Sequence, residues 1–263
     1  MLQNTNILFF ALAILPSLFY ICLLYFVVGR KFLNVQRSKR YLILGFLSTS
    51  IIEFIHYVFP EMNRYIFSGN QIINLILKTF IVIAFAEEMA KYTIFWWLTN
   101  DRKNKHKDLP IETIFYCVLV SSGFAIMENI SYLMAYGKSV LFIRAVSAII
   151  IHFILGIILG YFIAKSKSDI FIYNRNGGEK ELSKNSLFKK IFYTIAGVFS
   201  ATAVHGIYDA AIFLSPDARV TSFYVFAIIF LGLFISYLMI KEAIGQSGRL
   251  DAFYRKREKD EQK

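Results

Sequence analysis

The chain has 263 residues, of which 57% are hydrophobic and only 18% are charged, whereas soluble domains carry about 25% charged residues. This composition excludes an ordinary soluble domain and is typical of a membrane protein. The net charge of +11 comes from short basic clusters between apolar runs, so we expect its partner to be anionic lipid at the cytoplasmic face, and not nucleic acid.

The chain contains apolar runs of the length that crosses a membrane, about 20 residues. They are Ile7–Val28, Tyr41–Phe59, Ile72–Leu98, Ile111–Tyr136, Leu141–Ala164, Ile191–Leu214 and Ser222–Ile240. The first run is too long for the apolar part of a secretory signal, about 7 to 15 residues, so we expect it to be retained. The sequence predicts an all-α, polytopic membrane helix bundle of about seven transmembrane helices, residues 1–263 forming a single integral-membrane domain.

Basic residues are concentrated in every second connection between these runs. The connections after the first, third and fifth runs are rich in lysine and arginine, whereas the others hold one basic residue each: Arg64, Lys138 and Arg219. The positive-inside rule then places the N-terminus outside and the C-terminus in the cytoplasm of a bacterial-type plasma membrane. Residues 165–190 would form a basic cytoplasmic loop, either a small hairpin or a solvated linker, and residues 241–263 a charged cytoplasmic tail.

The cysteines argue against two kinds of site. Cys22 and Cys117 both lie inside apolar runs, which disfavours a disulfide framework and a thiolate zinc site. We expect both to be small core residues.

The third run contains ionisable residues in the motif "EEMAK". Each ionisable group at membrane depth costs at least about 2.5 to 3.5 kcal/mol, so it marks a candidate functional site. Glu87 and Lys91 are one helical turn apart, a spacing at which opposite charges can pair. Lys91 would keep a neighbouring carboxylate, Glu87 or Glu88, ionised. The alternative is a structural ion pair that joins helices.

The next runs carry polar groups at comparable depth. They are Glu128, Asn129 and Tyr132 in "ENISY", His152 in "HFILG", and His205 and Asp209 in "HGIYD". The last two residues are four positions apart, which suits a carboxylate that orients an imidazole. Arg144 lies near the outer end of the fifth run. Any single histidine here is more often a packing or hydrogen-bonding group, but consecutive helices with ionisable groups at one depth favour a shared cluster.

The second run offers a competing pair, Glu53 and His56. Their Glu-x-x-His spacing is that of di-iron bundles, but the sequence holds no second copy of it. Because the pair lies near the outer end of the run, we favour an interfacial role.

The polar set favours water activation. No serine, threonine or cysteine is obviously aligned with a base, so nucleophilic catalysis is the weaker interpretation. A glutamate can deprotonate water while a histidine or tyrosine donates to the oxyanion. Equally, zinc could be held with one position left for water, and the candidate ligands are His152, His205, Glu87 and Glu128. The same groups would also suit a proton- or cation-coupled transporter, or a non-catalytic scaffold or immunity protein.

The four motifs, in this order and on separate runs, resemble those of the PrsW-type intramembrane proteases, within the wider group of CAAX prenyl endopeptidases and bacterial Abi proteins. "EEMAK" matches Glu-Glu-x-x-Lys, "ENISY" matches Glu-x-x-x-Tyr, "HFILG" matches His-x-x-x-Gly and "HGIYD" matches His-x-x-x-Asp. Met127 stands where a phenylalanine often precedes the glutamate of the second motif.

The resemblance implies a protease that cuts a single-span membrane protein, such as an anti-sigma factor at its site-1 position in a stress response. The active-site residues it implies are Glu87, Glu88, Glu128, His152, His205 and Asp209, with Asp209 orienting His205. The supporting residues are Lys91, Asn129 and Tyr132. The family has been treated both as metal-dependent and as glutamate-dependent, so the resemblance leaves the use of zinc open.

Overall fold

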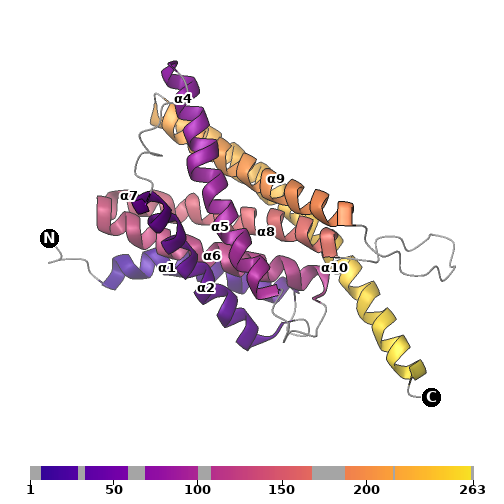
Figure 1. Ribbon diagram of the computed structural model, residues 1–263. Helices are drawn as coiled ribbons and strands as arrows, with labels where there is room; N and C mark the ends of the chain where they lie inside the picture. Colours follow the sequence, from indigo (N-terminus) through magenta and orange to yellow (C-terminus); the bar gives the residue numbers. More distant parts are fainter. Residues whose placement is uncertain are drawn as a thin grey trace.

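The computed structural model describes residues 7–28, 33–58, 69–99, 108–167, 187–215 and 217–261. Every regular element in this part of the chain is a helix, which confirms the all-α prediction. The helices are α1 (Ile7–Val28), α2 (Val35–Val58), α4 (Gln71–Leu77), η2 (Lys78–Phe85), α5 (Ala86–Thr99), α6 (Pro110–Tyr136), α7 (Lys138–Val146), α8 (Ala148–Lys167), α9 (Leu187–Leu214) and α10 (Ala218–Glu261). In Figure 1, α4, η2 and α5 form one continuous rod that crosses the bundle.

Five helical segments in the described ranges are long and apolar enough to cross a membrane. They are Phe9–Val28, Pro110–Tyr136, Phe142–Lys167, Leu187–Leu214 and Ala218–Ala252. The second and third predicted runs also lie in helices, but α2 begins with several basic residues and the α4–η2–α5 rod holds charged groups and is divided into pieces of 7, 8 and 14 residues. The count of seven spans therefore stays a prediction.

Two of the predicted segments have a different internal structure. The fifth run is divided into α7 and α8 at Ser147, whose hydroxyl donates to the Ile143 carbonyl at 3.0 Å. The predicted tail, residues 241–263, is helical as far as Glu261 because α10 continues beyond the last apolar run, and Figure 1 shows this end projecting from the bundle. The hairpin predicted within residues 165–190 lies largely outside the described residues, which stop at 167 and resume at 187.

The cysteine prediction holds for one of the two residues. Cys117 is buried in α6, as expected, and its thiol is free. The prediction is wrong for Cys22, which is exposed because its face of α1 points away from the other helices, together with Leu23 and Phe26.

Helices α6 and α8 form the centre of the bundle, and most of their side chains are buried. The helices approach closely because α8 presents Gly156 and Gly160 to α6. A β-carbon at Gly156 would lie 2.8 Å from the Val118 Cα atom, and one at Gly160 would lie 2.7 Å from the Ile114 Cα atom. Small residues four positions apart are a common way to pack membrane helices in contact. This contact fixes where the polar residues of the two helices meet.

The helix ends that the charge pattern assigns to the cytoplasm are joined by polar contacts. Arg37 of α2 lies 2.7 Å from Asp108, two residues before the start of α6. Lys165 of α8 lies 3.6 Å from Glu242 of α10, and the Ser247 hydroxyl of α10 accepts a 3.0 Å hydrogen bond from the backbone N–H of Ile111. These contacts place the starts of α2 and α6 and the ends of α8 and the apolar part of α10 on one side of the bundle.

The close approach at Gly156 can be tested with Gly156→Ala. The added methyl group would overlap the α6 backbone, which costs about 1–3 kcal/mol in a packed interior, so we expect a lower melting temperature in detergent micelles. The matched control is Gly248→Ala in α10, where a β-carbon would meet nothing within 4 Å. Because alanine favours a helix over glycine by about 1 kcal/mol, the control should be as stable as the unaltered protein or more so. Equal stability of Gly156→Ala would contradict the packing.

Candidate active site

A buried ion pair on α5 lies at the centre of the polar cluster. Lys91 Nζ contacts Glu88 Oε1 at 2.7 Å, and the same oxygen lies 2.9 Å from His205 Nδ1 of α9. The side chains of Glu88 and Lys91 are both only 1% exposed. A carboxylate paired with an ammonium accepts hydrogen bonds, so Nδ1 of His205 is the donor to Glu88. This leaves His205 Nε2 facing the rest of the cluster.

The second histidine is held in a parallel way. His152 Nε2 of α8 lies 2.8 Å from Glu128 Oε2 of α6, and His152 Nδ1 lies 3.1 Å from Lys91 Nζ. An ammonium group can only donate, so Nδ1 accepts from Lys91 and Nε2 carries the proton that is donated to Glu128. Each histidine is therefore oriented by one carboxylate, and Lys91 joins the two arms.

Glu87 lies between the arms and, unlike Glu88 and Glu128, is not held at hydrogen-bond distance by a cation or a histidine. Glu88 also has an unpaired buried oxygen, Oε2, but its Oε1 atom is bonded to both Lys91 and His205. The Oε2 atom of Glu87 is buried and makes no hydrogen bond with the described residues. It lies 3.8 Å from His205 Nε2 and 3.9 Å from Lys91 Nζ. Because buried polar atoms are nearly always hydrogen-bonded, an unpaired carboxylate oxygen facing an imidazole indicates a position that binds a ligand, a water molecule or a metal.

The segment before Glu87 is the π-helix η2, an element that is rare and often occurs at functional sites. Its Phe80 packs directly against α9 at Gly206, where a β-carbon would lie 2.6 Å from the Phe80 ring. Since Gly206 follows His205, this contact sets how closely the start of α5 approaches the imidazole.

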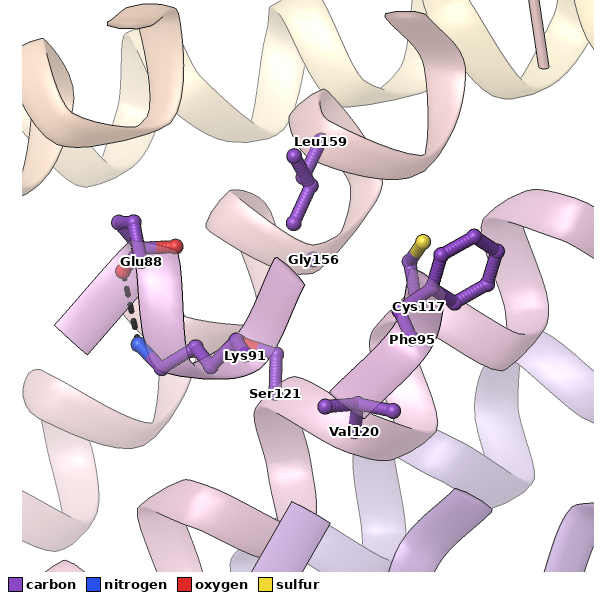
Figure 2. Close-up of a pocket in the computed structure, with 8 residues that line it drawn as sticks. All are labelled: Glu88, Lys91, Phe95, Cys117, Val120, Ser121, Gly156 and Leu159. Carbon is purple, nitrogen blue, oxygen red and sulfur yellow. Dashed lines mark hydrogen bonds and ion pairs between the residues drawn. The ribbon is translucent and has the colours of Figure 1, made fainter. Parts of the chain in front are cut away.

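The inner side of the cluster is closed. Figure 2 shows a narrow pocket behind the Glu88–Lys91 pair, bounded by the α8 backbone at Gly156 and lined by Glu88, Lys91, Phe95, Cys117, Val120, Ser121, Gly156 and Leu159. It has no room for a water molecule. By contrast, the side chains of Glu87, Asp209 and Glu128 are 11%, 14% and 15% exposed. A reactant would therefore reach the cluster from the side of these three carboxylates.

All of the predicted active-site residues are brought into this cluster, but their pairing differs from what sequence spacing suggested. Lys91 makes its short contact with Glu88, three residues away, and only a long one with Glu87. Asp209 Oδ2 is 3.5 Å from His205 Nε2, farther than Glu88 is from Nδ1. Glu88 therefore has the larger part in orienting His205. The catalytic roles of all these residues stay predictions.

The two remaining supporting residues lie beside the cluster and contact Arg144 of α7, which the motif analysis did not include among the site residues. Arg144 Nε donates to Asn129 Oδ1 at 3.2 Å, and the guanidinium carbon lies 3.6 Å from the centre of the Tyr132 ring. The signal that could have found Arg144 was its charge within an apolar run.

The competing pair of α2 lies at the surface. Glu53 is exposed and accepts a long 3.4 Å hydrogen bond from Ser131 of α6, in agreement with an interfacial position. The side chain of His56 lies outside the described residues.

The residues fit a metal ion such as zinc. One ligand atom from each of Glu87, His152 and His205 lies within 4.8 Å of the others, and imidazole nitrogen with carboxylate oxygen is a typical zinc donor set. The unpaired Glu87 Oε2 and the Nε2 atom of His205 face each other, and Glu88 holds the other nitrogen of His205, as carboxylates commonly do for zinc-bound histidines.

Comparison with known proteins identifies the family. The model of the PrsW family of intramembrane metalloproteases matches residues 37–235, well over half of the chain. The chain belongs to the PrsW family. The matched region includes every residue of the cluster, and together with the apolar helices it identifies an integral membrane protein.

Individual relatives are the PrsW proteases of several bacteria. The protein from Oceanobacillus iheyensis is 33% identical over 129 residues, 49% of this chain and 56% of the relative, and that from Bacillus subtilis is 30% identical over 133 residues, 51% and 57%. The protein from Clostridioides difficile is 28% identical over 199 residues, 74% of each chain. The chain thus spans little more than half the length of the first two PrsW relatives. No solved structure matches it.

The central ion pair gives a stability prediction. Removing one partner of a buried pair costs about 3–5 kcal/mol because the other charge is left buried, so Lys91→Met should strongly lower the free energy of unfolding. The control is Lys165→Met, which removes a pair whose side chains are 23% and 43% exposed and should cost less than about 1 kcal/mol. Unfolding in mixed micelles would measure both, and equal losses would contradict a central role for Lys91.

Proposed function

We propose that the protein is an intramembrane endopeptidase that hydrolyses a peptide bond in or beside the membrane segment of a single-span protein. The observation that carries this proposal is the Glu87 side chain. Its buried Oε2 atom makes no hydrogen bond with the described residues, and it lies close to two histidines that are each bonded to another carboxylate. Family membership supports the same reaction.

In this proposal Glu87 acts as the general base. Its free oxygen takes a proton from a water molecule, and the water oxygen forms a bond to the carbonyl carbon of the peptide. Negative charge then develops on the carbonyl oxygen, where His205 in its protonated form would donate from Nε2 while its Nδ1 keeps the bond to Glu88. His152 would keep its bonds to Lys91 and Glu128. The proton held by Glu87 passes to the leaving nitrogen as the C–N bond breaks, so one carboxyl group serves as base and then as acid.

The alternative form of this proposal uses zinc, held by Glu87, His152 and His205, with Glu128 as the fourth candidate ligand. Glu87 would then be a ligand and not the base, and His152 would bind in place of one of its contacts to Lys91 and Glu128. When bound, zinc would polarise the peptide carbonyl and acidify water. Glu88 and Lys91 would keep the His205 ring oriented, and Asp209 would face its Nε2 atom at the open side.

A groove beside the site supports a membrane-embedded substrate. It has a volume of about 210 Å³ and is lined by Leu75, Lys78, Thr79, Val82, Ile83 and Phe213. Ile83 is four residues before Glu87, and Phe213 is four residues after Asp209, so the groove lies about one helical turn from the catalytic carboxylates. Its mostly apolar lining suits an apolar stretch of a single-span protein. Among such proteins, the family resemblance favours a membrane-anchored anti-sigma factor and hence a stress response.

The membrane topology we propose has seven spans in a bacterial-type plasma membrane, with the N-terminus outside and the C-terminus and the basic loop in the cytoplasm. The alternation of basic connections supports it, as does the gathering of Arg37, Lys165 and Ser247 at one side of the bundle. In this topology the basic connections face anionic lipid.

The proposed reaction predicts that Glu87→Gln abolishes cleavage, because the amide cannot take a proton from water. New protein N-termini would be mapped in membranes and medium of cells that express the unaltered protein, Glu87→Gln or neither. Termini beside the membrane segment of a single-span protein should appear only with the unaltered protein. The control is Glu53→Gln, which changes an exposed carboxylate outside the cluster and should retain cleavage. Retained cleavage by Glu87→Gln would refute this role, and Glu87-dependent ion flux without any new termini would indicate a transporter.

The zinc proposal predicts loss of activity on metal removal. The purified protein should lose cleavage in a strong chelator and regain it when zinc is added back, and metal analysis should find about one zinc per chain, fewer in His205→Ala. Full activity in protein shown to be free of metal would instead favour the mechanism that relies on glutamate alone.

A further inference from the structure

We propose that Arg144 is a positioning residue of this site, which fixes Glu128 and, through Glu128, the imidazole of His152. Nothing in the sequence motifs assigns Arg144 a role. The kinetic test of this role depends on the proposed function, whereas the role itself is inferred from the geometry of the cluster.

Three contacts fix the plane of the Arg144 guanidinium. Its Nη2 atom lies 2.6 Å from Glu128 Oε1, its Nε donates to Asn129 Oδ1 at 3.2 Å, and its central carbon lies 3.6 Å from the centre of the Tyr132 ring. The Arg144 side chain is only 15% exposed. A planar guanidinium suits this combination of two directed hydrogen bonds and stacking on a ring, which the point charge of a lysine cannot reproduce.

Glu128 transmits this constraint to the histidine. One of its oxygens contacts Arg144, and the other contacts His152 Nε2 at 2.8 Å. A carboxylate held at both oxygens cannot rotate without breaking one contact, so the arginine fixes the direction from which His152 is bonded. Among the described residues Arg144 pairs with Glu128 and Asn129, and with neither His152 nor Glu87. It therefore acts through Glu128 and not on a reactant.

The two halves of the site follow the same design. His152 is bonded by Glu128, which is held by Arg144, and His205 is bonded by Glu88, which is held by Lys91. In both arms a cation fixes a carboxylate and the carboxylate fixes an imidazole. Outer partners of this kind commonly contribute about 10–100-fold to activity or metal affinity.

Asn129 and Tyr132 also gain a role from this arrangement. The Asn129 side chain is buried, and its Nδ2 atom has no hydrogen-bond partner among the described residues. The contact that orients this amide is therefore the one between its Oδ1 atom and Arg144. Tyr132 contacts the guanidinium through its ring face. The stacking requires an aromatic ring and not the hydroxyl group.

The position of Arg144 depends on the break between α7 and α8. At Ser147 the chain leaves α7, and the Ser147 hydroxyl lies 2.9 Å from the Tyr208 hydroxyl of α9. Tyr208 directly precedes Asp209, so the junction that carries Arg144 is attached to the helix that carries His205. This attachment places Arg144 at the side of the cluster where Glu128 and Asp209 are partly exposed.

The first test measures cleavage of a single-span test substrate that carries the mapped cleavage site. Arg144→Gln should lower kcat about 10–100-fold with little change in KM, and Arg144→Lys should restore only part of it. Tyr132→Leu, which removes the stacked ring, should lose more activity than Tyr132→Phe, which keeps it. The matched control is Lys138→Gln on the same helix, which removes a cation 5.7 Å from the Phe9 ring and should leave kcat unchanged.

The second test separates positioning from a general structural role. If Arg144 acts through Glu128, Arg144→Gln should cause no further loss of kcat in a Glu128→Gln background, since coupled residues give non-additive effects. The unaltered protein, the two single variants and the double variant would each be titrated with zinc alone against a competing chelator. Arg144→Gln should weaken zinc binding about 10–100-fold, and it should have no added effect in the Glu128→Gln background.

The outcomes distinguish this inference from the proposed function. If the unaltered protein does not cleave but Arg144→Gln weakens zinc binding as expected, the proposed function fails and the role of Arg144 stands. If cleavage occurs and Arg144→Gln retains full kcat, changes only KM, or adds its full effect in the Glu128→Gln background, the role of Arg144 is overturned. Absence of both cleavage and zinc binding in the unaltered protein counts against both.

Discussion

The buried contact between Glu88 and Lys91 is the interaction on which the site depends. Both side chains are almost completely removed from solvent, and their 2.7 Å contact lies between two histidines. Either charge alone at this depth would be strongly unfavourable, so each residue requires the other. Because Lys91 also donates to His152 and Glu88 accepts from His205, the pair connects the imidazoles of α8 and α9 to one helix.

This arrangement divides the acidic residues into two groups. Glu88 and Glu128 have oxygens committed to a cation and a histidine, and such carboxylates serve to hold other groups. Glu87 has no cation or histidine at hydrogen-bond distance, and it is the carboxylate that we propose for the chemistry. The adjacent glutamates of one motif thus have different environments, because neighbouring positions on a helix point in directions about 100° apart.

The packing of α6 and α8 makes the arrangement possible. Glycines of α8 bring its backbone against α6, and this close approach lets Glu128 reach His152 directly. The Ser121 hydroxyl of α6 also donates to the His152 backbone carbonyl at 2.6 Å, so the turn that carries the histidine is held at its main chain as well. A functional side chain on rigid, closely packed helices keeps its orientation, because the surrounding packing restricts its motion.

The sequence by itself determined the helical class, the position of nearly every helix and the set of residues that form the cluster. It could do so because apolar runs and buried charges are local features, each readable within one segment. Only the tertiary structure decided which groups pair: Lys91 with Glu88 in place of Glu87, and Arg144 with Glu128. Spacing along a helix shows which residues are neighbours one turn apart. The rotation and crossing of separate helices depend instead on packing between distant segments, such as the contact of Gly156 with α6 and the break between α7 and α8 at Ser147. The exposed position of Cys22 has the same cause, since an apolar run does not reveal which face meets lipid and which meets protein.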